Sequence, residues 1–179
     1  KIPVILLDSR IEGNEEWQQK FTHILYNSTP FQRVVQEMIL GIGGKRMLDS
    51  LGYTNIDTYH MNEGHAAFLI FELLKNLEDI EEVKKKAIFT THTPVPAGHD
   101  HFNHQLVMDI FRDRLPDNYK ELGGENDLNM SRLAINGSRY CNAVAQKHGE
   151  ITRTMFPDHE IDAITNGIHK GFWINPHFS

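Results

Sequence analysis

The 179-residue sequence lacks the features that mark several common classes of protein. Its single cysteine, Cys141, excludes an intramolecular disulfide and a zinc site built on several cysteines, and it indicates a reducing, cytoplasmic setting. No uninterrupted apolar run approaches the roughly 18 residues of a membrane span, so we expect no membrane partner. Lys and Arg number 18 against 24 Asp and Glu, a formal net charge of -6, which argues against a nucleic-acid partner.

The composition that is present is that of an ordinary globular domain. Hydrophobic residues make up 40% of the chain and charged residues 23%, which excludes a disordered tail or a fibrous repeat. The length predicts one domain over residues 1–179. The first eight residues lack the length and the cleavage site of a signal peptide, and the initiator methionine is missing. We therefore expect a piece of a longer protein.

Strand-like and helix-like segments alternate along the whole chain. Apolar runs, most of them short, predict strands over residues 2–7, 57–61, 87–91, 142–145 and 160–164. Helical spacing predicts helices over residues 30–51, 66–77, 80–86, 104–115, 129–138 and 148–155. Residues 9–27, 92–100 and 117–125 are expected to be loops, the first with a helical turn. This alternation predicts an α/β fold with a mainly parallel sheet.

The glycine run Gly41-Ile42-Gly43-Gly44 interrupts the first predicted helix, which begins at the cap Thr29 and at Pro30. The run lacks the order of a phosphate-binding P-loop and that of a dinucleotide-binding motif, and it does not follow a strand. The run therefore favours close helix packing, or a break between two helices, over ligand binding.

Polar clusters follow three of the predicted strands, at residues 62–65, 92–100 and 166–169. In open α/β sheets, ligands bind outside the carboxyl ends of the strands, so three such clusters can form one site. We expect Asn62 to cap the helix that follows, leaving backbone N–H groups for an anionic or hydroxyl-rich ligand. His92, flanked by hydroxyl residues and held by Pro94, is placed to hydrogen-bond a polar ligand.

Simpler structural explanations stay open for each cluster. The first can be a capped helix with two surface histidines, and His92 can be a buried histidine bonded to backbone groups. His99, His101 and His104, with Asp100 among them, can bind a divalent metal. The spacing of the cluster at residues 60–65 differs from that of a metalloprotease helix, because Glu does not follow the first His directly.

Four ordered motifs resemble the α-glucan phosphorylases, in particular the bacterial and archaeal short form. They are residues 60–68 (HMNEGHAAF), 89–100 (FTTHTPVPAGHD), 142–148 (NAVAQKH) and 165–173 (TNGIHKGFW). Residues 32–44 and the predicted strand at residues 4–8 fit in the same order. The resemblance implies part of the N-terminal, Rossmann-like domain of a GT-B glycosyltransferase fold, with helices flanking a parallel sheet.

The resemblance also implies a reaction. The full enzyme would transfer the terminal glucosyl unit of an α-1,4-glucan to inorganic phosphate, giving glucose 1-phosphate reversibly and with retention, as part of glycogen metabolism in the cytoplasm. Pyridoxal phosphate, whose phosphate group relays the proton, would be held by a lysine domain outside this chain. We therefore expect the isolated chain to be inactive. A homo-oligomer, a non-catalytic carbohydrate-binding or regulatory module, and a His-rich metal-binding protein remain open.

The motifs carry site residues of the family onto this sequence. The resemblance implies that His92 hydrogen-bonds the 6-hydroxyl of the sugar, while its backbone carbonyl faces the positive charge that develops in the transition state. It implies that Asn166 also holds the 6-hydroxyl and that Val144 lines the same pocket. Asn62 and His65 are predicted to contact substrate.

The chain departs from the animal and plant members at two of these motifs. Those members show Asn-Asp-Thr-His where this chain has residues 62–65, and Asn where it has Thr91. The short form tolerates both changes, so the assignment of His92 stands.

Overall fold

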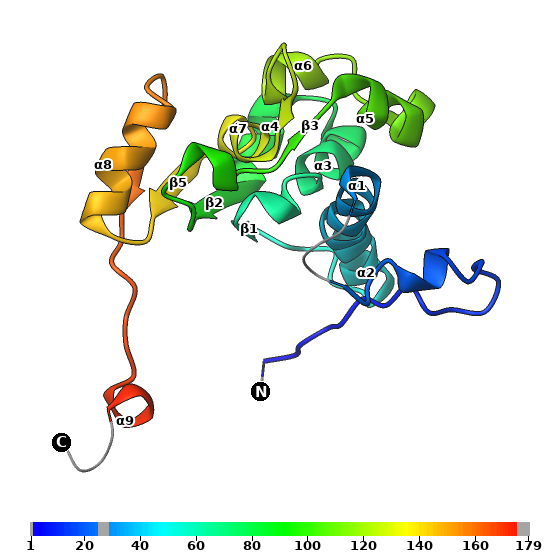
Figure 1. Ribbon diagram of the computed structural model, residues 1–179, viewed down its shortest axis with the longest axis horizontal. Coiled ribbons are helices and arrows are strands. Elements are labelled where there is room, and N and C mark those ends of the chain that lie inside the picture. The colour runs from blue at the N-terminus through cyan, green and yellow to red at the C-terminus, as the bar shows by residue number, and fades with distance from the viewer. Residues whose placement is uncertain (1, 25–28, 175–179) are drawn as a thin grey trace.

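The chain is described by a computed structural model, which covers residues 2–24 and 29–174 (Figure 1). Its main sheet has four parallel strands in the order β1-β2-β5-β6. They span β1 (Tyr59–Asn62), β2 (Ala87–Thr91), β5 (Tyr140–Ala143) and β6 (Asp162–Ala163). The predicted α/β fold with a parallel sheet is confirmed. The strand that was expected over residues 142–145 lies two residues earlier.

The first helical segment begins at the predicted cap. Thr29 Oγ1 accepts a hydrogen bond from the Gln32 backbone N–H at 3.3 Å, and the Gln32 side chain accepts one from the Thr29 N–H at 2.9 Å, so the two form a capping box. The segment runs through α1 (Pro30–Met38), a π-helical turn (Ile39–Gly43) and α2 (Gly44–Ser50). The break expected in this helix is therefore a π-helical turn.

Gly41 explains why the π-helical turn contains glycine. A Cβ atom at this position would lie 2.6 Å from the backbone nitrogen of Leu69 and 2.9 Å from the carbonyl oxygen of Ala66. The absence of a side chain lets the first helical segment touch the backbone that leads into the next helix. The expectation of close packing is confirmed here.

The remaining helices connect the strands and cover the sheet (Figure 1). They are η3 (Gly64–Ala66), α3 (Leu69–Leu77), α4 (Ile80–Lys86), α5 (His104–Phe111), α6 (Tyr119–Gly123), α7 (Met130–Asn136), α8 (Gln146–Met155) and α9 (Lys170–Trp173). The core lies between the sheet and these helices and includes the fully buried Phe68, Phe89 and Leu133. The Phe68 and Phe111 rings lie 4.9 Å apart between centroids, which joins α5 to this core.

The predicted strand at residues 2–7 is wrong. Ile2, Val4 and Leu6 are 92%, 82% and 87% exposed, and the segment runs beside α2 rather than beside a strand (Figure 1). Ile5 and Leu7 rest against the side chains of the first helical segment instead. A strand needs a hydrogen-bonding neighbour, and no strand of the described residues pairs with this segment.

Three further segments differ from expectation. The loop predicted at residues 117–125 contains α6, which buries Tyr119 and Leu122. A short antiparallel pair, β3 (His101–Phe102) with β4 (Leu128–Asn129), was not predicted. The helical turn expected within residues 9–27 is present at Gln18–Lys20, and residues 25–27 of that loop lie outside the described residues. Among the described helices, none has both the length and the apolar character needed to cross a membrane.

Candidate functional site

The carboxyl ends of the parallel strands form one edge of the sheet, and the predicted site residues lie along it. Asn62 ends β1, His92 follows β2, Val144 follows β5 and Asn166 lies three residues beyond β6. The backbone N–H of Asn166 donates to the carbonyl oxygen of Val144 at 3.1 Å, which joins the last two segments. Thr91 pairs with Ala143 in the sheet, so His92 and Val144 leave adjacent strands at the same level.

The polar side chains along this edge are open to solvent. Asn62, His92 and Asn166 are exposed, whereas Val144 and His65 are half-buried. Within residues 2–24 and 29–174, the side chains of Asn62, His92 and Asn166 form no hydrogen bond. Two amides and an imidazole are therefore available to hydroxyl groups of a ligand.

A row of polar side chains crosses the sheet just below this edge. Thr90 Oγ1 donates to Asn142 Oδ1 at 2.8 Å, and His60 Nε2 lies 2.8 Å from the same hydroxyl. A hydroxyl carries one hydrogen, and that hydrogen goes to Asn142, so His60 Nε2 is the donor. The row ties β1, β2 and β5 together. Sequence reasoning missed it, because the strand register that aligns these side chains is not visible in the sequence.

Glu63, directly after β1, is a second residue that sequence reasoning missed. Its Oε2 accepts hydrogen bonds from the His92 backbone N–H at 2.7 Å and from Thr93 Oγ1 at 2.8 Å. Its Oε1 accepts from the Gly64 N–H at 2.9 Å. Glu63, not Asn62, is the cap of the following helical turn, so the predicted cap is wrong and this N–H is not free for an anion. The available signal was a carboxylate placed between a strand end and a glycine.

His65 faces a charged cluster beside α1. Its Nδ1 lies 3.6 Å from Asp100 Oδ2, and Arg33 Nη2 donates to Asp100 at 2.7 Å and to Glu37 at 2.9 Å. Burial raises the pKa of Glu37 to about 9, and the neighbouring Asp100 charge adds to this rise. Burial also acts to raise the pKa of Asp100, but hydrogen bonds from His65 and Arg33 outweigh it and hold this pKa well below its usual range. Glu37 is therefore protonated while Asp100 is charged.

The same cluster has the spacing of a metal site. One ligand atom from each of Glu37, His65 and Asp100 lies within 4.8 Å of the other two. Arg33 already places a positive charge on both carboxyl groups, which opposes a second cation there. The cluster is explained by a shared proton and the Arg33 charge, without a bound ion.

The three histidines considered as metal ligands have separate partners. His99 Nδ1 bonds to a serine hydroxyl of α7 at 2.7 Å, and His101 Nδ1 lies 3.1 Å from Asp127. His104 Nε2 bonds to a backbone carbonyl oxygen at 3.1 Å. In the described part of the chain, these histidines do not form a group with ligand spacing.

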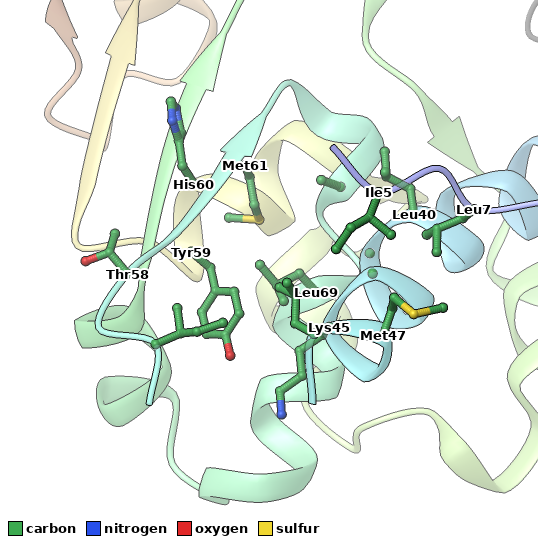
Figure 2. Close-up of a pocket in the computed structure, with 15 residues that line it drawn as sticks. Ile5, Leu7, Leu40, Lys45, Met47, Thr58, Tyr59, His60, Met61 and Leu69 are labelled. Atoms are coloured by element: carbon green, nitrogen blue, oxygen red, sulfur yellow. The ribbon is translucent and has the colours of Figure 1, made fainter. Parts of the chain in front are cut away.

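An apolar groove of about 420 Å³ lies beside β1, away from the carboxyl edge. Figure 2 shows Ile5, Leu7 and Leu40 on one side of it and Tyr59 and Met61 on the other. The residues predicted to bind sugar after β2, β5 and β6 do not line it. Its lining offers few hydrogen-bonding groups for a sugar, so the groove is not the candidate site.

Comparisons with known proteins place the chain among related sequences. No protein-family model matches it. It is 39% identical, over 98% of its length, to the maltodextrin phosphorylase of Thermococcus litoralis, and 34% identical, over 98%, to the glycogen phosphorylase of Mycobacterium tuberculosis. It is 30% identical, over 97%, to the glycogen phosphorylase of Aquifex aeolicus. The chain spans 24%, 25% and 29% of these three relatives, about a quarter of their length.

Proposed function

We propose that this chain, which is homologous to one part of the maltodextrin and glycogen phosphorylases, forms one wall of the sugar site of an α-1,4-glucan phosphorylase. The full protein would transfer a terminal glucosyl unit to inorganic phosphate and release glucose 1-phosphate with retention. The observation that carries this proposal is the open carboxyl edge of the parallel sheet. Four strands deliver polar or pocket-lining residues to it, and these residues come from the motifs that resemble the family.

His92 is the proposed catalytic residue. Its side chain is exposed at the end of β2, where an imidazole can donate to or accept from a sugar hydroxyl. Its backbone carbonyl would stabilise the positive charge on the glucosyl group in the transition state. A fixed dipole of this kind is effective because it needs no reorganisation during the reaction.

Asn166 and Val144 are proposed to complete the pocket for the same glucosyl unit. The hydrogen bond between their backbones fixes the distance between the two segments. The exposed Asn166 amide offers both a donor and an acceptor for the 6-hydroxyl, and Val144 offers an apolar contact for the sugar ring.

Asn62 and His65 are proposed to contact the glucan from the β1 side of the edge. Asn62 ends its strand with an exposed amide. His65 Nδ1 is directed at Asp100, so Nε2 is the ring nitrogen that remains for a ligand. The Asp100 contact also fixes the orientation of this ring.

Pyridoxal phosphate is the proposed cofactor of the full protein, where its phosphate group would supply proton transfer. The open groups at the described edge are two amides and an imidazole, which suit sugar hydroxyls and do not form a phosphate cradle. The residues present therefore do not fit the cofactor, and we propose that other parts of the longer protein hold it. The chain would then be inactive by itself, as a part of the N-terminal Rossmann-like domain in a cytoplasmic enzyme.

The test uses the gene extended to its natural ends. The purified protein is incubated with pyridoxal phosphate, inorganic phosphate and maltodextrin, and glucose 1-phosphate is measured over time. The proposal predicts release that depends on phosphate, with none when phosphate is replaced by sulfate. Binding of maltodextrin without release, in protein that is folded and carries the cofactor, would contradict the catalytic function and support a carbohydrate-binding module.

A further inference from the structure

Glu63 has a backbone conformation that glycine normally occupies. Its φ of 69° and ψ of 167° lie in a region that is sterically unfavourable for residues with a Cβ atom. Among the described residues, two other non-glycine residues have positive φ, Glu78 and Arg112. Glu78 ends α3 in the left-handed conformation that is common at helix ends, and its side chain is exposed. Glu63 instead lies at a strand end within the candidate site.

The side chain of Glu63 connects two strands at that edge. Its backbone N–H donates to the Thr90 carbonyl at 2.9 Å, which extends the pairing of β1 with β2 by one residue. Its carboxylate then crosses to the loop after β2 and accepts from the His92 N–H and the Thr93 hydroxyl, at 2.7 and 2.8 Å. One side chain thus holds the first two residues of the loop that carries the proposed catalytic group.

The carboxylate is itself held in place. Its second oxygen accepts from the Gly64 N–H, and the residue is 8% exposed. A Cβ atom on Gly64 would lie 3.2 Å from the Ser131 hydroxyl of α7, so this part of the backbone packs tightly on that helix. A carboxylate with three hydrogen bonds and little contact with water has few other orientations.

Strain of this kind persists only where the surrounding structure requires it. Glycine at position 63 would relieve the backbone strain but would remove the carboxylate. Because the strained residue keeps its side chain on His92 and Thr93, these contacts explain its presence better than the backbone does.

We propose that Glu63 is a positioning residue, which fixes the His92 backbone so that the His92 ring and carbonyl meet the glucosyl unit in the transition state. This inference rests on the proposed function of His92. Glu63 does not touch the substrate and acts through the loop. A misplacement of about 1 Å at a reacting group can lower a rate by roughly 10²-fold, so the effect of losing this anchor is measurable.

The kinetic test compares variants of the full-length, cofactor-loaded protein. Glu63→Gly removes the carboxylate and relieves the strain, and Glu63→Gln keeps the shape but leaves one acceptor oxygen. We expect kcat/KM for maltodextrin to fall about 10²-fold in Glu63→Gly, through kcat, and about tenfold in Glu63→Gln. Glu78→Gly is the matched control, because it also relieves a positive φ at a glutamate, and its kcat should equal that of the wild type.

A second measurement follows the His92 amide directly. In the wild type, hydrogen exchange at the His92 N–H should be roughly tenfold slower than at Val95 in the same loop, and Glu63→Gln should remove this difference. A wild-type kcat in Glu63→Gly, or rapid exchange at His92 in the wild type, would overturn the positioning role. If the wild type releases no glucose 1-phosphate, the proposed function fails, and the exchange rates alone decide whether Glu63 holds the loop.

Discussion

Gly41 and Gly44 allow a sharp test of how the first helical segment packs, because they lie three residues apart and differ in their surroundings. A Cβ atom at Gly41 would lie 2.6 Å from the Leu69 nitrogen and 2.9 Å from the Ala66 oxygen. Both are backbone atoms and cannot swing aside. A Cβ atom at Gly44 would meet nothing within 4 Å. Replacing each glycine by alanine therefore adds the same methyl group to a closed and to an open position.

The two variants are expected to change stability in opposite directions. Forcing a methyl group into a closed site costs about 1–3 kcal/mol. In the open site, alanine is favoured over glycine in a helix by about 0.5–1 kcal/mol. The expected difference between Gly41→Ala and Gly44→Ala is therefore roughly 2–4 kcal/mol. At about 2–4 °C per kcal/mol for a chain of this size, their melting temperatures should differ by about 4–16 °C.

The assay is thermal denaturation followed by circular dichroism, with both variants and the wild type in one buffer. Gly41→Ala should melt below the wild type and Gly44→Ala at or above it. If Gly41→Ala proved as stable as Gly44→Ala, the close contact between the π-helical turn and the backbone of residues 66–69 would be refuted.

Three further predictions concern buried groups of the described residues. The folded-state pKa of Glu37, about 9 against 4.5, means that its contribution to stability is full below pH 4.5 and is lost as pH rises through 9. Glu37→Gln should therefore flatten the fall in unfolding free energy between about pH 5 and pH 8, by up to about 1 kcal/mol per pH unit in urea titrations, and an unchanged slope would contradict this. Burial raises the pKa of Cys141 to about 12, so iodoacetamide near neutral pH should label it only after unfolding, and rapid labelling of native protein would count against its burial. Phe68→Ala should lower the unfolding free energy by about 3–5 kcal/mol, because Phe68 is fully buried, and a loss below about 1 kcal/mol would argue against that core.

Much of the fold follows from local sequence signals. The helix Ile80–Lys86 and the strand Ala87–Thr91 have the bounds that the sequence predicts. The Asp79 side chain accepts from the Glu81 N–H at 2.9 Å and starts the helix, and the β-branched and aromatic residues of the strand fit a buried sheet. The segment at residues 2–7 shows the limit of such signals. Its apolar pattern is that of a strand, but pairing depends on a neighbour that the pattern does not specify.

The candidate site was only partly predictable. The position of His92 at a strand end follows from the alternation of elements. The support beneath it does not, because Glu63 and His92 are 29 residues apart and meet only when β1 and β2 pair. Glu37 shows the same limit. In the sequence it is one charged residue of a helix, whereas in the fold it is 1% exposed and shares Arg33 with Asp100.

The most direct test of the proposed function is the effect of His92→Ala on phosphorolysis by the full-length protein. The glucan, phosphate and pyridoxal phosphate are kept saturating or varied one at a time, and cofactor content and folding are checked for each variant. The account predicts that kcat/KM for maltodextrin falls by on the order of 10²-fold or more, as expected for loss of a contact made in the transition state. A value equal to that of the wild type would contradict the role of His92 and, with it, the placement of the sugar site at the carboxyl edge of the sheet.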